Sequence, residues 1–169
     1  MDNSILPHRR KKLVLIFYLL ATFLIQTEIL AGANGSCPVT VLESKSVSGI
    51  PAGTDANYGW YGSTKLAVAI PKNGIWIGMG PEKNYGDKFW WWSDGYSIND
   101  YLKETLNLTV KKLNGNRESF ALSSELGAQT GGVDLMLIGI NFPSKGCWQI
   151  EGTYKDRYLQ FVLQVGEKN

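Results

Sequence analysis

Histidine is almost absent from this chain of 169 residues, since His8 is the one imidazole that it contains. Cysteine is scarce too, with Cys37 and Cys147 as the two thiols, so the chain is no disulfide-dense miniprotein. A domain that begins after His8 cannot run a Ser-His or Cys-His nucleophile system, and it offers no imidazole to zinc or copper. These absences argue against several common enzyme classes.

Long apolar runs are also missing, because the longest, Leu13–Ile25, falls short of the about 20 residues that a membrane-spanning helix needs. A basic stretch, His8–Lys12, precedes this run, and small residues that end at Ala33 follow it. Basic, apolar and small segments in that order are typical of a signal peptide. The sequence therefore predicts a signal helix over residues 1–33, cleaved after Ala33, and export of the rest. Retention of the segment as a membrane anchor is the alternative.

Excess positive charge is absent from the remaining domain, residues 34–169. Removal of residues 1–33 takes away four of the 17 basic and two of the 15 acidic residues, which leaves 13 of each. A near-neutral domain lacks the electrostatic footprint of a nucleic-acid-binding protein. The expected partner is a protein or a glycan, with no nucleic acid. Membrane contact is expected only through the N-terminal segment or through a lipid on Cys37.

Cys37 and Cys147 both lie beyond the predicted cleavage site. An even pair of cysteines in an exported chain predicts one disulfide, and the loop of about 110 residues that it closes is worth about 4 to 5 kcal/mol in the chain-entropy model. The alternatives are two free thiols, or an acylated Cys37 beside a buried Cys147. Gly35 and Ser36 fit the lipoprotein pattern, but Asn34 stands where that pattern has Leu.

What the domain does contain is apolar residues at every second position, the period of half-buried strands. The runs that show this period are Leu66–Ile70, Ile75–Met79, Leu106–Lys111, Met136–Phe142, Trp148–Tyr154 and Leu159–Val165. In the second run the period places Ile75, Ile77 and Met79 on one face.

Turn signals such as Asn73-Gly74 separate these runs at short intervals. The sequence therefore predicts an all-β fold, an antiparallel β-sandwich of about seven to eight strands over residues 34–169. A turn of helix is expected near Ile98–Glu104. The polar, Gly-rich stretch Glu118–Gly132 reads as a long loop, with a short strand at Phe120–Leu122 at most.

Three segments of the sequence are similar to segments of known proteins. The sequence NFPSKGCWQIEGTY at Asn141–Tyr154, followed by LQFV at Leu159–Val162, resembles the closing hairpin of exported bacterial β-sandwich proteins and lipoproteins of unknown function. Cys37–Thr40 is similar to the start of their mature region, and Lys88–Trp92 to their central aromatic strand. The three segments cover about a quarter of the chain. The resemblance implies an immunoglobulin-like sandwich and no known activity.

Aromatic residues give the main lead to function. On a strand, Trp90 and Trp92 point to the face opposite Phe89 and Trp91, so one pair can enter the core while the other faces solvent, a loop or a partner. Exposed rings can stack on sugars or anchor a protein partner. The candidate platform consists of Tyr58, Trp60, Tyr61, Trp90 and Trp92. The alternative is that the tryptophans only fill a core.

Other chemistry has weak support. Asp94, Asn99 and Asp100 could place oxygens around calcium, but their spacing does not match the twelve-residue calcium loop, so we expect turn formers and no metal site or cofactor. We expect no catalytic residues and no enzymatic activity, because nucleophile, phosphate-loop and dinucleotide motifs are lacking. The sequence predicts an exported, non-catalytic binding or interaction module. The alternatives are a structural envelope-associated protein and a carbohydrate-binding module.

Overall fold

The computed structural model describes residues 36–42, 56–77, 85–100, 105–116, 118–124 and 126–166. The predicted signal helix and its cleavage site, residues 1–33, lie outside the described residues. Within the described ranges, no helix is long and apolar enough to cross a membrane.

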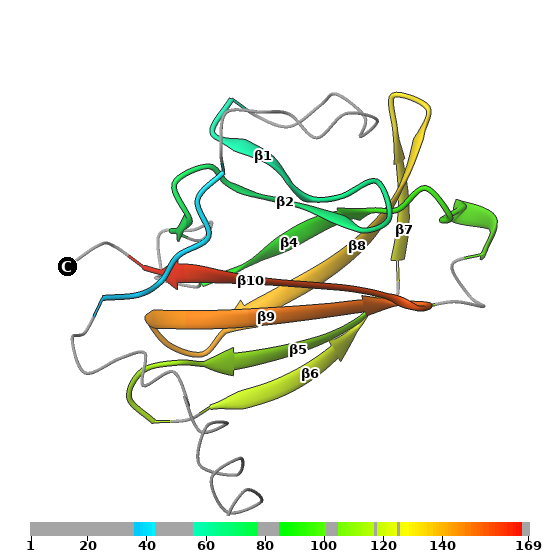
Figure 1. The fold of residues 1–169 in the computed structure, drawn as a ribbon. Helices are drawn as coiled ribbons and strands as arrows, with labels where there is room; N and C mark the ends of the chain where they lie inside the picture. The colour runs from blue at the N-terminus through cyan, green and yellow to red at the C-terminus, as the bar shows by residue number, and fades with distance from the viewer. Residues whose placement is uncertain are drawn as a thin grey trace, which may run out of the picture. The chain divides into compact units, whose positions relative to one another are not determined.

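The described residues form ten strands and one short 3-10 helix, arranged as two stacked sheets (Figure 1). The elements are β1 (Tyr58–Gly62), β2 (Ala67–Pro71), β3 (Ile75–Trp76), β4 (Tyr85–Trp92), η1 (Ile98–Asp100), β5 (Asn107–Lys112), β6 (Ser119–Ser123), β7 (Leu126–Thr130), β8 (Val133–Phe142), β9 (Gly146–Tyr154) and β10 (Arg157–Val165). One sheet has the order β1-β2-β4-β8-β7 and the other β3-β10-β9-β5-β6. The predicted all-β sandwich is confirmed, with more strands than the seven to eight expected.

The strand order is immunoglobulin-like. Strands β2-β4-β8-β7 follow the order A-B-E-D of an immunoglobulin domain, and β10-β9-β5 follow the order G-F-C of its second sheet. The seven strands also appear along the chain in the order A to G. Strands β1, β3 and β6 are additions at sheet edges. The expectation of an immunoglobulin-like sandwich therefore holds at the level of topology.

Two expectations about strands were wrong. In the run from Ile75, Trp76 is buried and Ile77 is 69% exposed, the reverse of the predicted face. The reason is the register of β3, a two-residue edge strand that pairs in parallel with β10: Trp76 lies opposite the core residue Val165, so it faces the core.

The stretch Glu118–Gly132 is not a long loop. It contains β6, which pairs with β5, and β7, which pairs with β8 through a two-residue turn at Gly131-Gly132. Both turn glycines have positive φ, which favours a hairpin whose twist matches the flanking strands. Strand β7 carries few apolar residues, so it is defined by its pairing with β8 rather than by its own pattern.

The core between the sheets is aromatic. Trp76 stacks on Phe89 with ring centroids 4.2 Å apart, and Trp148 packs against Phe142 at 5.5 Å. The indole of Trp148 donates a hydrogen bond to the carbonyl oxygen of Ser144 at 3.0 Å. Trp91 lies over Gly152 of β9, on the facing sheet, where a side chain larger than that of glycine would collide with the ring.

A disulfide joins Cys37 to Cys147, with the two Cα atoms 5.3 Å apart, so the predicted bridge is confirmed. The segment that follows Cys37 runs beside β10, where the Thr40 amide donates to the Val162 carbonyl at 2.8 Å and the Val162 amide donates to the Thr40 hydroxyl at 2.9 Å. This segment covers part of an exposed sheet edge. A sulfur in a disulfide cannot also carry a lipid thioether, so the bridge and the acylated alternative exclude each other in any one molecule.

We expect the bridge to contribute about 2–5 kcal/mol to the free energy of unfolding, because it closes a loop of 110 residues. Urea unfolding of the Cys37→Ala/Cys147→Ala double variant should therefore give a lower midpoint. A reducing agent should lower the midpoint of the unmodified protein to that of the double variant and leave the variant itself unchanged. Equal midpoints for all four samples would contradict this role.

Gly152 and Gly139 form a matched pair for testing the core. A Cβ at Gly152 would lie 2.7 Å from Cζ3 of Trp91 and closer still to Cη2, whereas a Cβ at Gly139 would meet nothing within 4 Å. We expect Gly152→Ala to destabilise the fold by about 1–3 kcal/mol through overpacking. Gly139→Ala should leave stability unchanged or raise it slightly. Thermal unfolding checks both variants. An unchanged midpoint for Gly152→Ala would contradict the close packing of Trp91 on Gly152.

Candidate functional site

The aromatic run of β4 is divided between two environments. Phe89 and Trp91 are buried in the core, at 1% and 0% exposure. Trp90 is 38% exposed and Trp92 is half-buried, on the side of the sheet that faces away from the core. The expectation that one pair enters the core and the other leaves it is confirmed.

Trp60 on β1 lies on the same outer side as Trp90 and Trp92. Val68 and Ile70 of β2 belong to the core, so Ala67 and Ala69 between and beside them face outward. Trp60 is the cross-strand partner of Ala69, and Trp92 is the partner of Ala67. Directly opposed residues of an antiparallel pair share a face, so these tryptophans flank a row of two alanines.

The outer apolar row continues across the rest of the sheet. Trp90 is paired with Leu137 of β8, and Leu137 with Leu126 of β7, while Leu135 is paired with Ala128. We call this set the tryptophan face: Trp60, Ala67, Ala69, Trp90, Trp92, Leu126, Ala128, Leu135 and Leu137. By these pairings it forms a band about two side chains wide that crosses all five strands. Figure 1 shows these strands side by side in one sheet.

Among the outward positions of these five strands, Lys88 is the one charged residue, at the rim of the band opposite Gly139. Ala67 and Ala69 are buried although they point outward, and Leu126 is 58% exposed. The exposed part of the tryptophan face therefore comes from its other members, above all Trp90 and Leu126. Exposed apolar groups that gather on one side of a soluble domain often mark an interaction site.

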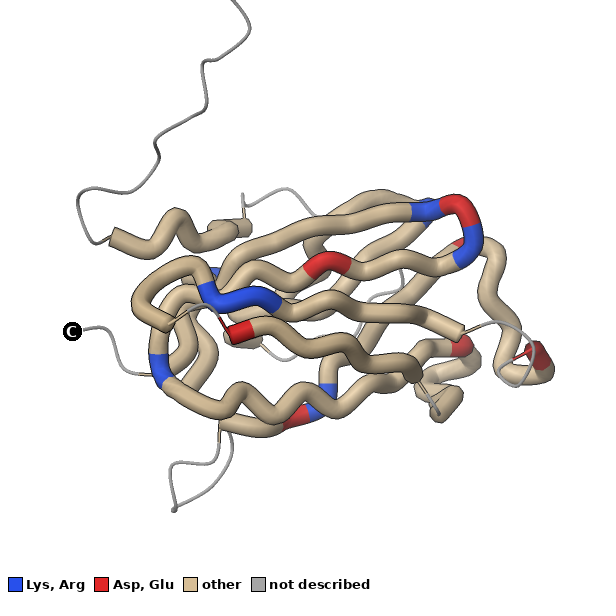
Figure 2. The backbone as a smooth tube through the Cα atoms, turned by 90° about the horizontal axis from the view of Figure 1, so that it is seen from below, with Lys and Arg blue, Asp and Glu red and all other residues tan. Residues whose placement is uncertain are grey.

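The outer face of the other sheet is polar. Its outward residues include Asn107, Thr109, Lys111, Glu151 and Thr153, and several pair with one another. Lys111 forms an ion pair with Glu151 at 3.1 Å across neighbouring strands. Figure 2 shows that charged residues also gather at turns and strand ends, while long stretches of strand carry none. One molecule thus presents two outer faces of opposite character.

The structure does not bring all five predicted platform residues onto one face. Tyr61 is opposite Val68, on the core side of β1, and its ring meets Phe161 with centroids 6.3 Å apart. Tyr58 packs edge-on against Trp76 at 6.1 Å. Trp60, Trp90 and Trp92 remain together on the outer face.

Sequence reasoning missed the leucines of β7 and β8. Leu135 and Leu137 alternate with the core residues Met136 and Ile138, so the run from 135 to 138 is apolar on both faces. A continuous apolar run within an otherwise alternating strand is the signal that could have identified them.

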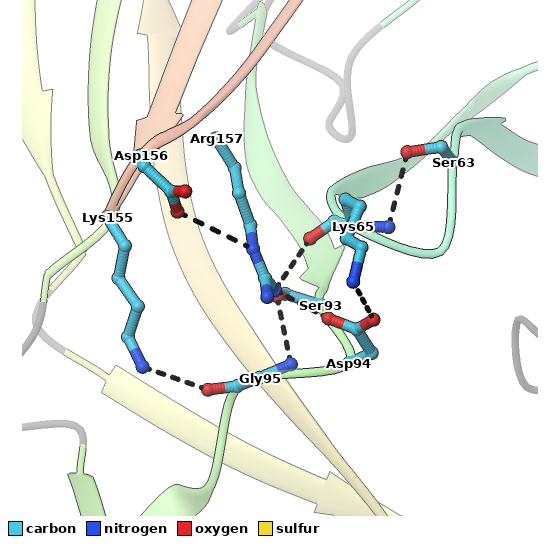
Figure 3. Close-up of polar contacts among 8 residues, drawn as sticks. All are labelled: Ser63, Lys65, Ser93, Asp94, Gly95, Lys155, Asp156 and Arg157. Atoms are coloured by element: carbon cyan, nitrogen blue, oxygen red, sulfur yellow. Dashed lines mark hydrogen bonds and ion pairs between the residues drawn. The ribbon is translucent and has the colours of Figure 1, made fainter.

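A second cluster, of charged groups, closes one end of the sandwich (Figure 3). Arg157 at the start of β10 points toward the chain around β2 and β4, where its Nη1 donates to the Lys65 carbonyl oxygen at 3.0 Å and pairs with Asp94 Oδ1 at 2.7 Å. It also donates to the Ser93 hydroxyl. Lys155 donates to the Gly95 carbonyl at 3.1 Å. These contacts tie the two sheets together.

A hollow of about 380 Å³ lies beside this cluster, lined by Ser63, Lys65, Leu66, Asp156, Arg157 and Tyr158. Because the Arg157 guanidinium already meets the Asp94 carboxylate and backbone oxygen, it is a structural latch rather than a free anion-binding group. Asp94, which the sequence predicts to be a turn former, belongs to the same latch. Its carboxylate pairs with Arg157 and also accepts a hydrogen bond from Lys65 at 3.1 Å. No group of three metal-ligating side chains occurs within the described ranges.

Known proteins give no guide to the chain, since no family model matches it and neither curated proteins nor solved structures yield a significant match.

The latch predicts an acid dependence of stability. The hydrogen bond from Lys65, assisted by the charge of Arg157, lowers the pKa of Asp94 below its ordinary value of 3.8. A lowered carboxyl pKa stabilises the fold above the ordinary value, and this contribution is lost as the pH falls through the folded-state pKa. Asp94→Asn should therefore lower the thermal midpoint at pH 6. Its midpoint should also fall less than that of the unmodified protein when the pH is lowered below about 4.

Asp156→Asn is the control for this experiment. It removes the same charge from a side chain that is 94% exposed and lies 4.0 Å from Arg157, so we expect a profile close to that of the unmodified protein. Thermal unfolding from pH 2 to pH 7 compares the three proteins. Parallel curves for Asp94→Asn and the unmodified protein would contradict the latch.

Proposed function

We propose that this protein is an exported, non-catalytic binding module that engages its partner through the tryptophan face. The observation that carries the proposal is the contrast between the two outer faces. Both belong to the same sandwich and both lie outside the core, yet one is polar and ion-paired and the other is an apolar band with three indole rings.

Stability of the domain alone does not require such a band. An outward strand position accepts Thr, Lys or Gln readily, as the sheet with β5 and β9 illustrates. Exposed Trp90 and Leu126 add the hazard of nonspecific association. Tryptophan, in contrast, is among the residues that most often carry binding energy at interfaces. A purely structural envelope protein would have its aromatics entirely in the core, so the partial exposure of Trp60, Trp90 and Trp92 favours the binding module.

Two features support export. The Cys37–Cys147 disulfide is typical of proteins that fold in an oxidising compartment. The N-terminal basic, apolar and small segments supply the signal that would take the chain there. Together they support the proposal that the tryptophan face lies at the cell surface, in the periplasm or outside the cell.

A photo-cross-linking amino acid tests the proposal without knowledge of the partner. We expect benzoylphenylalanine in place of Trp90 to give a covalent adduct in the host that exports the protein. The same group in place of Tyr158, which is 58% exposed on the polar sheet, is the matched control and should give little adduct. Thermal unfolding verifies that both variants are folded.

Adduct yields that are equal at the two positions, or absent at both, would overturn the proposal. Either result would mean that the tryptophan face does not bind a partner in preference to the polar face.

A further inference from the structure

We infer that the tryptophan face binds a neutral, extended polysaccharide chain of the β-1,4-linked class. This inference rests on the proposed function and names the chemistry of its ligand. Three properties of the face lead to it: its charge, the chemistry of its surface groups and its size.

The face carries almost no charge. Its two outward rows contain no Asp, Glu, Lys or Arg, and Lys88 at the rim is the one charged outward side chain of the five described strands. An anionic glycan, a nucleic acid or an acidic peptide would find no set of cations to meet its charges. A neutral ligand is the one that this surface suits.

The surface groups suit the faces of sugar rings. A pyranose with equatorial hydroxyls has two apolar faces of C–H groups, which pack on an indole while the hydroxyls at the ring edge stay in water. An open sheet face leaves those hydroxyls hydrated, so the site needs few polar partners. Beside Trp90 and Leu137, the outward face at Gly139 is open, with nothing within 4 Å of a Cβ placed there.

The spacing of the strands that carry the rings suits an extended chain. Trp60 and the Trp90/Trp92 pair are separated by β2, so their strands are two spacings, about 10 Å, apart. That separation is close to the repeat of two β-1,4-linked pyranoses. The sugars of a helically coiled α-linked chain such as amylose follow a curve, so they match a straight row across the strands less well.

The size of the face argues against a second copy of the chain or another folded protein. Five strands span about 19 Å between the outermost strand axes, and two outward residues span about 7 Å along a strand. Even with a side chain's width added on every side, this band falls short of the about 800 Å² that each partner buries in a stable protein complex. An extended glycan chain, only one sugar wide, is accommodated by it.

Pull-down on insoluble cellulose, chitin and β-mannan tests the inference, with insoluble starch as the α-linked comparison. We expect retention on at least one β-1,4-linked polymer and none on starch. Trp60→Ala and Trp90→Ala should each weaken retention about threefold to tenfold, a loss of about 0.7–1.4 kcal/mol in binding free energy. Tyr158→Ala, on the polar sheet, should bind as the unmodified protein does.

Gly139→Lys is a second probe that does not remove any ring. The side chain meets open space, so the fold should be retained, while the lysine stands on the face beside Trp90 and obstructs a chain that lies there. We expect retention to fall at least threefold while the protein stays folded. The thermal midpoint should fall slightly, because Lys88 lies directly opposite position 139 and repels the new charge. Undiminished retention in Gly139→Lys and in both tryptophan variants would overturn the inference.

The two proposals fail in distinguishable ways. No retention on any β-1,4-linked polymer overturns the polysaccharide inference, and if the cross-linker at position 90 still forms an adduct with a protein, the binding module stands with a protein ligand. If retention occurs but depends equally on Tyr158, the tryptophan face is not the binding surface and both proposals fall.

Discussion

The alternation of side chains along β4 is the constraint on which the rest of the molecule depends. The run Phe89-Trp90-Trp91-Trp92 is continuous in sequence, and a strand must send successive residues to opposite faces. Burial of Phe89 against Trp76 and of Trp91 against Gly152 therefore fixes Trp90 and Trp92 on the outer side. The core and the candidate binding surface are two sides of one strand.

Because β4 lies in the middle of its sheet, this division propagates to both neighbours. Cross-strand pairing places Ala67 opposite Trp92 and Leu137 opposite Trp90, so small residues flank the indoles on one side and leucines on the other. A shift of register by one residue would move the outer rings into the core and the core rings out. The tryptophan face thus depends on the same pairings that assemble the core.

Polar stabilisation is concentrated at the ends and edges of the sandwich. Arg157 joins the two sheets at one end, and the disulfide holds the segment after Cys37 against β10. Neither feature lies in the outward rows of the tryptophan face. The latch and the disulfide are thus spatially separate from that face.

The strands with strict alternation could be predicted from the sequence, since burial of one face imposes period two on runs such as Leu106–Lys111 and Leu159–Val165. The disulfide followed from the even cysteine count. Strands β3 and β7 could not be placed, because a two-residue edge strand has no period and β7 is defined by its partner β8. The separation of Trp60 from Tyr61 depends on which face of the edge strand β1 meets the core, and the pairing of Tyr61 with Val68 decides that. Tyr58 has the same alternation as Trp60, and its ring leaves the set because it packs against Trp76, a tertiary contact that the sequence pattern does not reveal. The likeness to exported β-sandwich proteins stays a prediction.

Hydroxyl-radical footprinting of the six tryptophans tests the central division most directly. Trp76, Trp91 and Trp148 are at most 2% exposed, whereas Trp90 is 38% exposed and Trp60 and Trp92 are half-buried. The account predicts that peptide mass spectrometry finds oxidation at Trp60, Trp90 and Trp92 and protection at the other three. Oxidation of Trp91 to the same extent as Trp90 would contradict it, because β4 would then not divide its rings between a core and an outer face.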